Sequence, residues 1–188
     1  MQALLVVDAQ KEFSSAGKRP VANYDSAVSA IRRFADAARR EDRPIAWVRH
    51  FNRPHESRAF VPGLWGADLA VGLGPQPGRD AERLFDKDVF GAFTGTGLEE
   101  WLRALGVTEL LVAGFYTHMC LSTSVREALV RGFDVFIDPE ATGARALEHA
   151  ELGSLSAYEV RRTALLQLAD MGARIVNAHT PSAVPVPA

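Results

Sequence analysis

The chain has 188 residues, of which 47% are hydrophobic, and its formal net charge is −2 with a pI of about 6.2. This length and composition suit one domain with one substantial core. The near-neutral charge gives no basis for electrostatic binding to nucleic acid or to a membrane surface, so we expect neither as a partner.

The first half of the chain alternates strand and helix patterns. The apolar run 3–7 predicts a strand buried on both faces. Residues 24–41 repeat apolar side chains at helical spacing, and 45–51 predict a second strand. Between 52 and 80, four prolines and five glycines interrupt any regular pattern. An irregular segment of that length inside a compact domain is typical of a functional loop.

The second half continues the alternation. Its expected elements are a weak strand at 83–87, a helix at 97–105, a strong strand at 109–114, a helix at 121–131, a strand at 134–138, a helix at 149–171 and a strand at 174–177. Alternating strands and helices predict an α/β fold with a parallel sheet covered on both faces. We expect one domain over 1–180 and a poorly ordered, proline-rich tail over 181–188.

Three chemically useful residues follow three of the predicted strands. Asp8 follows the first strand, Lys87 ends the third, and Cys120 lies shortly after the fourth. Taken singly, they could be a turn residue, a solvated lysine and a small buried hydrophobe. Because ligands of open α/β sheets bind beyond the carboxyl ends of the strands, all three are expected at one site.

Cys120 is also expected at the start of a helix. There the helix dipole and a neighbouring Lys87 ammonium would lower the pKa of the thiol. The sequence therefore predicts a thiolate nucleophile near neutral pH.

Three motifs carry a family resemblance that extends from Leu4 to about Val176. They are Val-Asp-Ala-Gln-Lys-Glu-Phe at 7–13, Lys87 with Phe-Gly-Ala-Phe at 90–93, and Gly-Phe-Tyr-Thr-His-Met-Cys at 114–120. In this order the motifs resemble those of the isochorismatase-like cysteine hydrolases. That superfamily includes nicotinamidases, N-carbamoylsarcosine amidases, ureido and biuret amidohydrolases, and isochorismatases.

The resemblance implies a three-layer α/β/α sandwich with six parallel strands in the order 3-2-1-4-5-6. It implies that Asp8, Lys87 and Cys120 form a catalytic triad that cleaves a C–N bond of an amide, ureide or carbamoyl compound through a thioester. The backbone N–H groups of Tyr116 and Cys120 would hold the oxyanion. A cis peptide bond is expected between Phe115 and Tyr116.

Further residues are candidates for substrate binding. Phe13, Trp65, Phe90 and Tyr116 could form an aromatic pocket, and His50 and His118 could face it.

A metal site is not expected. Nicotinamidases bind a metal through an aspartate and histidines after the second strand. Here Val48 stands at the place of that aspartate, although His50 and His55 follow it. Because metal sites need three or more converging ligands, we predict no metal and no other cofactor.

Three alternative functions are weighed against C–N hydrolysis. An isochorismatase-type vinyl-ether hydrolase would use the aspartate as its acid, but the presence of Cys120 favours C–N cleavage. A catalytically silent binding or assembly relative is disfavoured because all three triad positions are filled. A dinucleotide-binding protein would need a glycine-rich turn after the first strand, and 8–13 contain no glycine.

The remaining expectations concern compartment and assembly. Cys120 is the only cysteine, so an internal disulfide is excluded. The sequence starts with no positively charged leader, and its first apolar run is too short to span a bilayer. Together with the single thiol, these features are typical of a cytoplasmic protein. The substrate should be a small molecule, and apolar surface on the helices after Cys120 favours a homodimer or homotetramer.

Overall fold

We describe the fold from a computed structural model, which covers residues 1–53 and 55–177. The expected tail at 181–188 lies outside the described residues. So does the end of the expected domain at residue 180, and both stay predictions.

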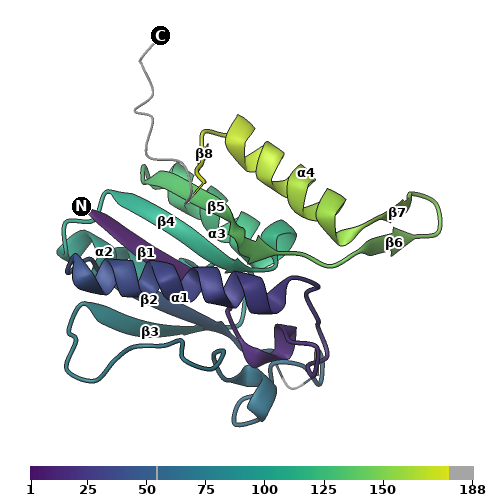
Figure 1. Cartoon of the computed structure of the whole chain (residues 1–188), viewed down its shortest axis with the longest axis horizontal. Helices are drawn as coiled ribbons and strands as arrows, with labels where there is room; N and C mark the ends of the chain where they lie inside the picture. Colours follow the sequence, from purple (N-terminus) through teal and green to yellow (C-terminus); the bar gives the residue numbers. More distant parts are fainter. Residues whose placement is uncertain (54, 178–188) are drawn as a thin grey trace.

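A six-stranded parallel sheet forms the centre of the molecule (Figure 1). Its strands are β1 (Gln2–Val7), β2 (Ile45–His50), β3 (Glu82–Lys87), β4 (Glu109–Phe115), β5 (Asp134–Gly143) and β8 (Arg174–Ile175). They are arranged β3-β2-β1-β4-β5-β8, and all neighbouring pairs are parallel. The predicted fold class and strand order are confirmed, with β8 as the sixth strand of this sheet.

Helices cover both faces of the sheet, as the apolar strands require. One face packs against α1 (Tyr24–Arg40). The opposite face packs against α2 (Leu98–Ala104), α3 (Ser122–Val130) and α4 (Ala157–Asp170). Successive β1 side chains alternate between the two cores: Leu4 and Val6 face α1, whereas Leu5 and Val7 face the other layer.

Residues 55–80 of the long irregular segment cover the α1 side of the sheet. This part contains the 3-10 helix Trp65–Ala67. Ala59, Phe60 and Ala70 are buried in the same core as α1. The buried Gln10 side chain donates hydrogen bonds to the carbonyl oxygens of His50 and Ala67, at 3.0 and 2.7 Å. The cover is therefore fastened to the ends of β1 and β2.

Two predicted boundaries in the C-terminal half are wrong. The helix expected at 149–171 begins only at Ala157, because a hairpin of β6 (Leu147–His149) and β7 (Gly153–Leu155) precedes it. Ser156 caps α4 and forms a reciprocal capping box with Glu159, which is a sequence signal for this helix start. The strand expected at 134–138 continues to Gly143 through an irregular register opposite β4.

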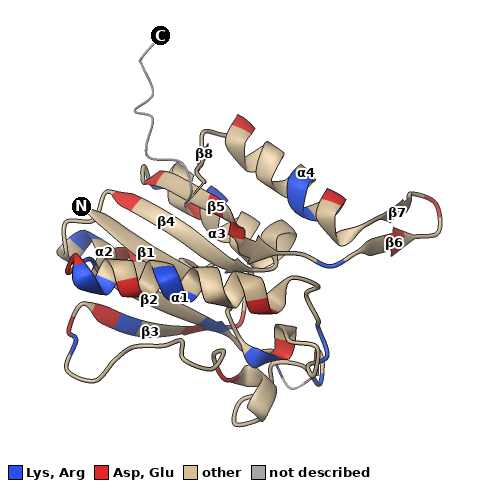
Figure 2. Ribbon diagram, in the orientation of Figure 1, with Lys and Arg blue, Asp and Glu red and all other residues tan. Residues whose placement is uncertain are grey.

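The hairpin β6–β7 extends away from the main sheet (Figure 1). Leu152 at its turn is 85% exposed. Lys and Arg are interspersed with Asp and Glu along the chain (Figure 2). None of the helices in the described part combines the length and the apolar character that a bilayer crossing requires. Self-association and a cytoplasmic location stay predictions.

Candidate active site

The strands β1 and β4 place Asp8 and Cys120 at the switch point of the sheet. β1 pairs with β2 on one side and with β4 on the other, so the chain order reverses between β1 and β4. Asp8 directly follows β1 and has a φ of 52°, in the left-handed region that a non-glycine residue rarely adopts. This is the crevice in which open α/β sheets bind ligands.

Lys87 reaches the same place from the edge strand β3. Its Nζ donates a hydrogen bond to Asp8 Oδ2 at 2.8 Å, and both side chains have no exposed surface. The Val89 carbonyl oxygen accepts a second hydrogen bond at 3.0 Å. His50 Nδ1 lies 3.4 Å from the ammonium. The long lysine side chain therefore spans β2 to meet Asp8, a contact that the sequence could not demonstrate.

His50 is oriented by its second ring nitrogen. Its Nε2 lies 2.8 Å from Asn52 Oδ1. Because an amide oxygen only accepts hydrogen bonds, Nε2 carries the proton, and Nδ1 is left as the acceptor that faces Lys87.

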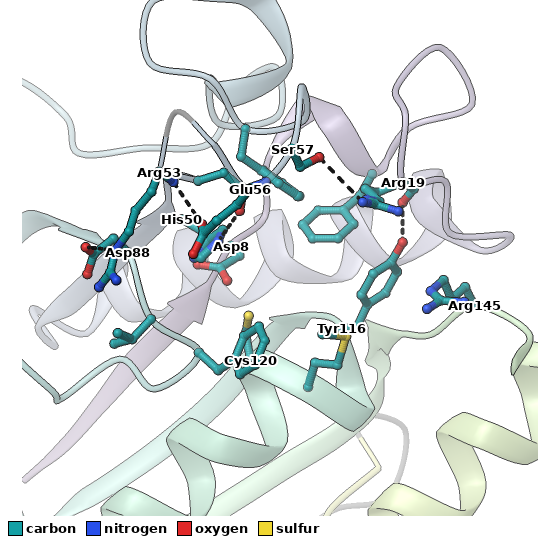
Figure 3. Close-up of a pocket in the computed structure, with 16 residues that line it drawn as sticks. Asp8, Arg19, His50, Arg53, Glu56, Ser57, Asp88, Tyr116, Cys120 and Arg145 are labelled. Atoms are coloured by element: carbon teal, nitrogen blue, oxygen red, sulfur yellow. Dashed lines mark hydrogen bonds and ion pairs between the residues drawn. The ribbon is translucent and has the colours of Figure 1, made fainter.

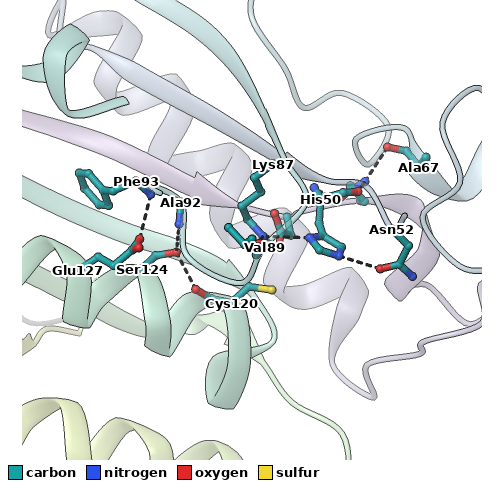
Figure 4. A network of polar contacts seen from close by, with 12 residues as sticks. His50, Asn52, Ala67, Lys87, Val89, Ala92, Phe93, Cys120, Ser124 and Glu127 are labelled. Atoms are coloured by element: carbon teal, nitrogen blue, oxygen red, sulfur yellow. Dashed lines mark hydrogen bonds and ion pairs between the residues drawn. The ribbon is translucent and has the colours of Figure 1, made fainter. Parts of the chain in front are cut away.

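Cys120 lies in a π-helical turn, Thr117–Leu121, which leads into α3. Single π-helical turns occur frequently at functional sites. The Cys120 carbonyl oxygen accepts a hydrogen bond of 2.7 Å from Ser124 Oγ (Figure 4). Ser124 Oγ in turn accepts a hydrogen bond of 3.0 Å from the backbone N–H of Ala92. The Glu127 carboxylate accepts a hydrogen bond of 2.9 Å from the backbone N–H of Phe93. The chain after β3 is thus held against the turn that carries Cys120.

Gly91 in this segment lies directly against α3, where a side chain would overlap the Glu127 carboxylate. Sequence reasoning noticed the Phe-Gly-Ala-Phe motif but missed Ser124 and Glu127. Their positions one turn apart on the predicted helix after Cys120 were the available signal.

The turn between β4 and Cys120 is tightly packed against β1. Gly114 has a φ of +122°, and a β-carbon there would overlap the carbonyl oxygen of Val7. Only glycine fits such a position. The peptide bond between Phe115 and Tyr116 is cis. Tyr116 Oη donates a hydrogen bond of 2.8 Å to the Arg19 carbonyl oxygen.

The electrostatics of Cys120 differ from the expected thiolate. Burial raises the pKa of the Cys120 thiol, the Asp8 carboxylate raises it further, and Lys87 only partly opposes both. Burial would lower the pKa of Lys87, but Asp8 and Cys120 together raise it above its usual value. The Lys87 ammonium is therefore charged and paired with Asp8, and the Cys120 thiol keeps its proton at neutral pH. The thiolate prediction considered the helix start and Lys87 but omitted desolvation and Asp8.

These charges predict opposite effects of two substitutions on the reactivity of Cys120. Asp8→Asn removes the negative charge and should lower the pKa of the thiol, so alkylation by iodoacetamide at pH 7 becomes faster. Lys87→Met removes the positive charge and should raise that pKa, so alkylation becomes slower. In the wild type, alkylation should be slower than that of cysteine in the unfolded chain.

The measurement is the rate of Cys120 alkylation against pH, followed by intact mass. Glu56→Gln is the matched control, because Glu56 lines the same cavity and is not among the groups that shift the pKa of the thiol. Equal rate changes in all three variants would contradict the assignment of the effect to Asp8 and Lys87.

A cavity of about 500 Å³ opens above Asp8 and Cys120 (Figure 3). Of the predicted residues, Asp8, Phe13, His50, Phe90, Tyr116 and Cys120 line it. Phe13 contacts the rings of Phe60 and Tyr116, with centroids 5.0 and 4.8 Å away. Of the four aromatic residues predicted for a pocket, Phe13, Phe90 and Tyr116 therefore line the cavity, and Phe60, which was not predicted, joins them. Sequence reasoning missed these lining residues: Arg19, Asn52, Arg53, Glu56, Ser57, Phe60, Asp88, Val89, Met119 and Arg145.

Two expected substrate contacts are not in the cavity wall. Trp65 is 52% exposed in the cover segment, 6.0 Å from Lys11 Nζ. His118 packs beside the Tyr116 ring, at 5.2 Å between centroids, and does not line the cavity, whereas Cys120 of the same π-helical turn does. Burial, helped by Arg145, lowers the pKa of His118 to about 4, so the ring is neutral.

The side chains around Asp8 include three groups of types that bind metal ions. Ligand atoms of Asp8, His50 and Cys120 lie within 4.8 Å of one another. The Lys87 ammonium, however, already occupies the space between Asp8 and His50, and a divalent cation there would be repelled by it. His55 is exposed and belongs to no group of converging ligands among the described residues. These residues do not fit a metal ion.

Comparison with known proteins agrees with this geometry. The model of the isochorismatase domain matches residues 2–179. The chain belongs to the isochorismatase family. This isochorismatase-family hydrolase is 31% identical to nicotinamidase 3 of Arabidopsis thaliana over 74% of its own length and 72% of the relative. It is 28% identical to the secreted isochorismatase effector Isc1 of Verticillium dahliae, over 93% of its own length and 86% of the relative.

The solved structure of an isochorismatase from Pseudomonas putida superimposes on the chain with a TM-score of 0.85. The two are 33% identical, and the match covers 94% of this chain and 87% of the other.

Proposed function

We propose that this isochorismatase-family hydrolase cleaves the C–N bond of a small amide, ureide or carbamoyl compound through a thioester on Cys120. The observation that carries the proposal is the convergence of three buried groups under one cavity. Lys87 Nζ lies 2.8 Å from Asp8 Oδ2, and a carboxylate oxygen of Asp8 lies within 4.8 Å of Cys120 Sγ. A nicotinamidase among its relatives supports an amide as the bond that is cleaved.

Acylation begins from the protonated thiol. Asp8 Oδ1 has no hydrogen-bond partner among the described residues, whereas Oδ2 is held by Lys87. Asp8 takes the thiol proton as the sulfur attacks the carbonyl carbon. The backbone N–H groups of Tyr116 and Cys120 hold the oxyanion, a contribution of about 3 kcal/mol per donor. The proton then passes from Asp8 to the leaving nitrogen as the C–N bond breaks.

Deacylation reverses these roles. Asp8 removes a proton from a water molecule, whose oxygen attacks the thioester carbonyl. The C–S bond breaks, and the proton returns from Asp8 to the sulfur. Lys87 remains charged throughout and holds the Asp8 side chain in place through its hydrogen bond to Oδ2.

The proposal is tested with a panel of amides, ureides, carbamoyl amino acids and isochorismate. We expect ammonia or amine release from at least one C–N substrate, and a mass increase of the protein equal to the acyl group when the reaction is quenched. Dialysis against a strong chelator should leave the rate unchanged, because Lys87 fills the place of a cation. Turnover of isochorismate alone would replace the proposal by ether hydrolysis. Loss of activity that zinc, iron or manganese restores would contradict metal independence.

A further inference from the structure

The two ends of the cavity differ in whether their charged side chains form ion pairs. Figure 3 shows Arg53 and Asp88 at one end and Arg19 and Arg145 at the other, with Asp8 and Cys120 between them. Arg53 Nε donates to Asp88 Oδ2 at 2.9 Å, so the charge at that end is balanced. Lys87 is balanced by Asp8.

The two arginines at the opposite end have no such balance. Within residues 1–53 and 55–177, neither Arg19 nor Arg145 forms an ion pair with a carboxylate. Arg19 Nη2 donates only a long hydrogen bond, 3.5 Å, to Ser57 Oγ. Arg145 Nη1 donates to the carbonyl oxygen of Ala146 at 3.1 Å. Most of the guanidinium N–H groups at this end are therefore available to a ligand.

Both arginines are positioned by the fold rather than by chance. Arg145 comes two residues after β5, at the carboxyl edge of the sheet. The backbone of Arg19 is fixed by the hydrogen bond that Tyr116 Oη donates to its carbonyl oxygen. The Tyr116 ring lies between them in the cavity wall (Figure 3). The cavity carboxylate of Glu56 is turned to the other end, where it accepts a hydrogen bond from the backbone N–H of Arg53.

We propose that Arg19 and Arg145 form an anion subsite that binds a carboxylate of the substrate, at the end remote from the bond that is cleaved. This rests on the proposed function and specifies its substrate class as carboxylate-bearing amides or carbamoyl compounds. A guanidinium presents paired N–H donors that match the two oxygens of a carboxylate. The apolar wall of Phe13 and Phe60 would contact the chain that links the carboxylate to the scissile carbonyl.

The test measures binding and does not need turnover. In the Cys120→Ala background, calorimetry determines Kd for N-carbamoylglycine, N-carbamoyl-β-alanine and N-carbamoyl-4-aminobutyrate, each paired with its uncharged primary amide. These probes differ in the reach of the carboxylate from the carbamoyl group. For at least one pair we expect the carboxylate to bind about tenfold or more tighter than its amide.

Substitution separates the subsite from the rest of the cavity. Arg19→Gln and Arg145→Gln should each reduce the preference for the carboxylate several-fold, and the double variant should abolish it. The Kd of the amides should stay unchanged, which shows that the cavity is intact. Arg58→Gln is the matched control, because Arg58 is an exposed arginine like Arg19 and Arg145 but does not line the cavity.

Three outcomes would overturn the subsite. They are equal affinity for carboxylate and amide in every pair, no measurable binding of any carboxylate at millimolar concentration, and a preference that survives in the double variant. Failure of the proposed function is seen separately, as the absence of an acylated Cys120 and of product in the substrate panel. A carboxylate preference that persists without C–N cleavage would keep the subsite and reject the reaction.

Discussion

Replacement of Cys120 by alanine is expected to lower kcat by about 10⁴-fold or more, because removal of the proposed nucleophile leaves only binding and oxyanion contacts to accelerate the reaction. The fold should survive. Cys120 is buried, 7% exposed, but the substitution removes a single sulfur atom from the end of a core, which costs about 1 kcal/mol. The measurements are kcat on the best substrate of the panel and the free energy of unfolding in urea.

Ser122→Ala is the matched control for this prediction. Ser122 is equally buried, lies two residues from Cys120 at the start of α3, and does not line the cavity. It should keep kcat within a few-fold of the wild type. If Cys120→Ala retains more than a tenth of the wild-type rate, Cys120 is not the nucleophile and a mechanism based on Asp8 alone must be considered.

The second large effect is expected from the Asp8–Lys87 pair, which we propose contributes to both catalysis and stability. Asp8→Asn should lower kcat by about 10²–10⁴-fold, because an amide cannot carry the proton between sulfur, nitrogen and water. Each single substitution, Asp8→Asn or Lys87→Met, leaves one charge in a site without exposed surface. Breaking a buried pair in this way costs about 3–5 kcal/mol of unfolding free energy.

The double variant Asp8→Asn with Lys87→Met separates the two roles. Since it leaves neither charge unpaired, its loss of stability should be smaller than the sum of the two single losses by about 2 kcal/mol or more. Its kcat should stay as low as that of Asp8→Asn. Stability that recovers without activity would show that the pair is retained for chemistry.

The chain offers a matched pair for comparison. Arg49 on β2 faces Asp86 on β3, the residue directly before Lys87. The two side chains form a 2.8 Å ion pair and are 25% and 49% exposed. The same cycle at this exposed pair should give a coupling below about 1 kcal/mol. Equal coupling at both pairs would mean that burial of Asp8 and Lys87 does not govern their interaction.

The sequence by itself determined the sheet and brought forward the three groups that we propose to react. Uninterrupted apolar runs such as 3–7 and 109–114 can only be buried on both faces, and their alternation with helices fixes a parallel sheet. The carboxyl ends of such strands share one edge, so Asp8, Lys87 and Cys120 could be assigned to one site from their order alone.

Local sequence patterns were less successful at predicting helix boundaries and side-chain directions, because tertiary contacts also influence both. The pattern at 149–171 was interpreted as one helix although Ser156 and Glu159 mark a new start. Trp65 and His118 were placed in the cavity because of their residue types, but side-chain direction depends on a 3-10 helix and a π-helical turn. Neither turn has a periodic pattern that a sequence displays.

Only the tertiary structure decided the charge state of the site and the polarity of its cavity. Whether Cys120 is a thiol or a thiolate depends on how completely β1, β2 and the chain after β3 exclude water around Asp8 and Lys87, and desolvation is set by all of them together. Arg19 and Arg145 lie 126 positions apart in the chain and belong to no motif. The hydrogen bond from Tyr116 holds Arg19 in the cavity wall, and the end of β5 places Arg145 there. Two residues so far apart in the chain meet only because the elements that carry them pack together.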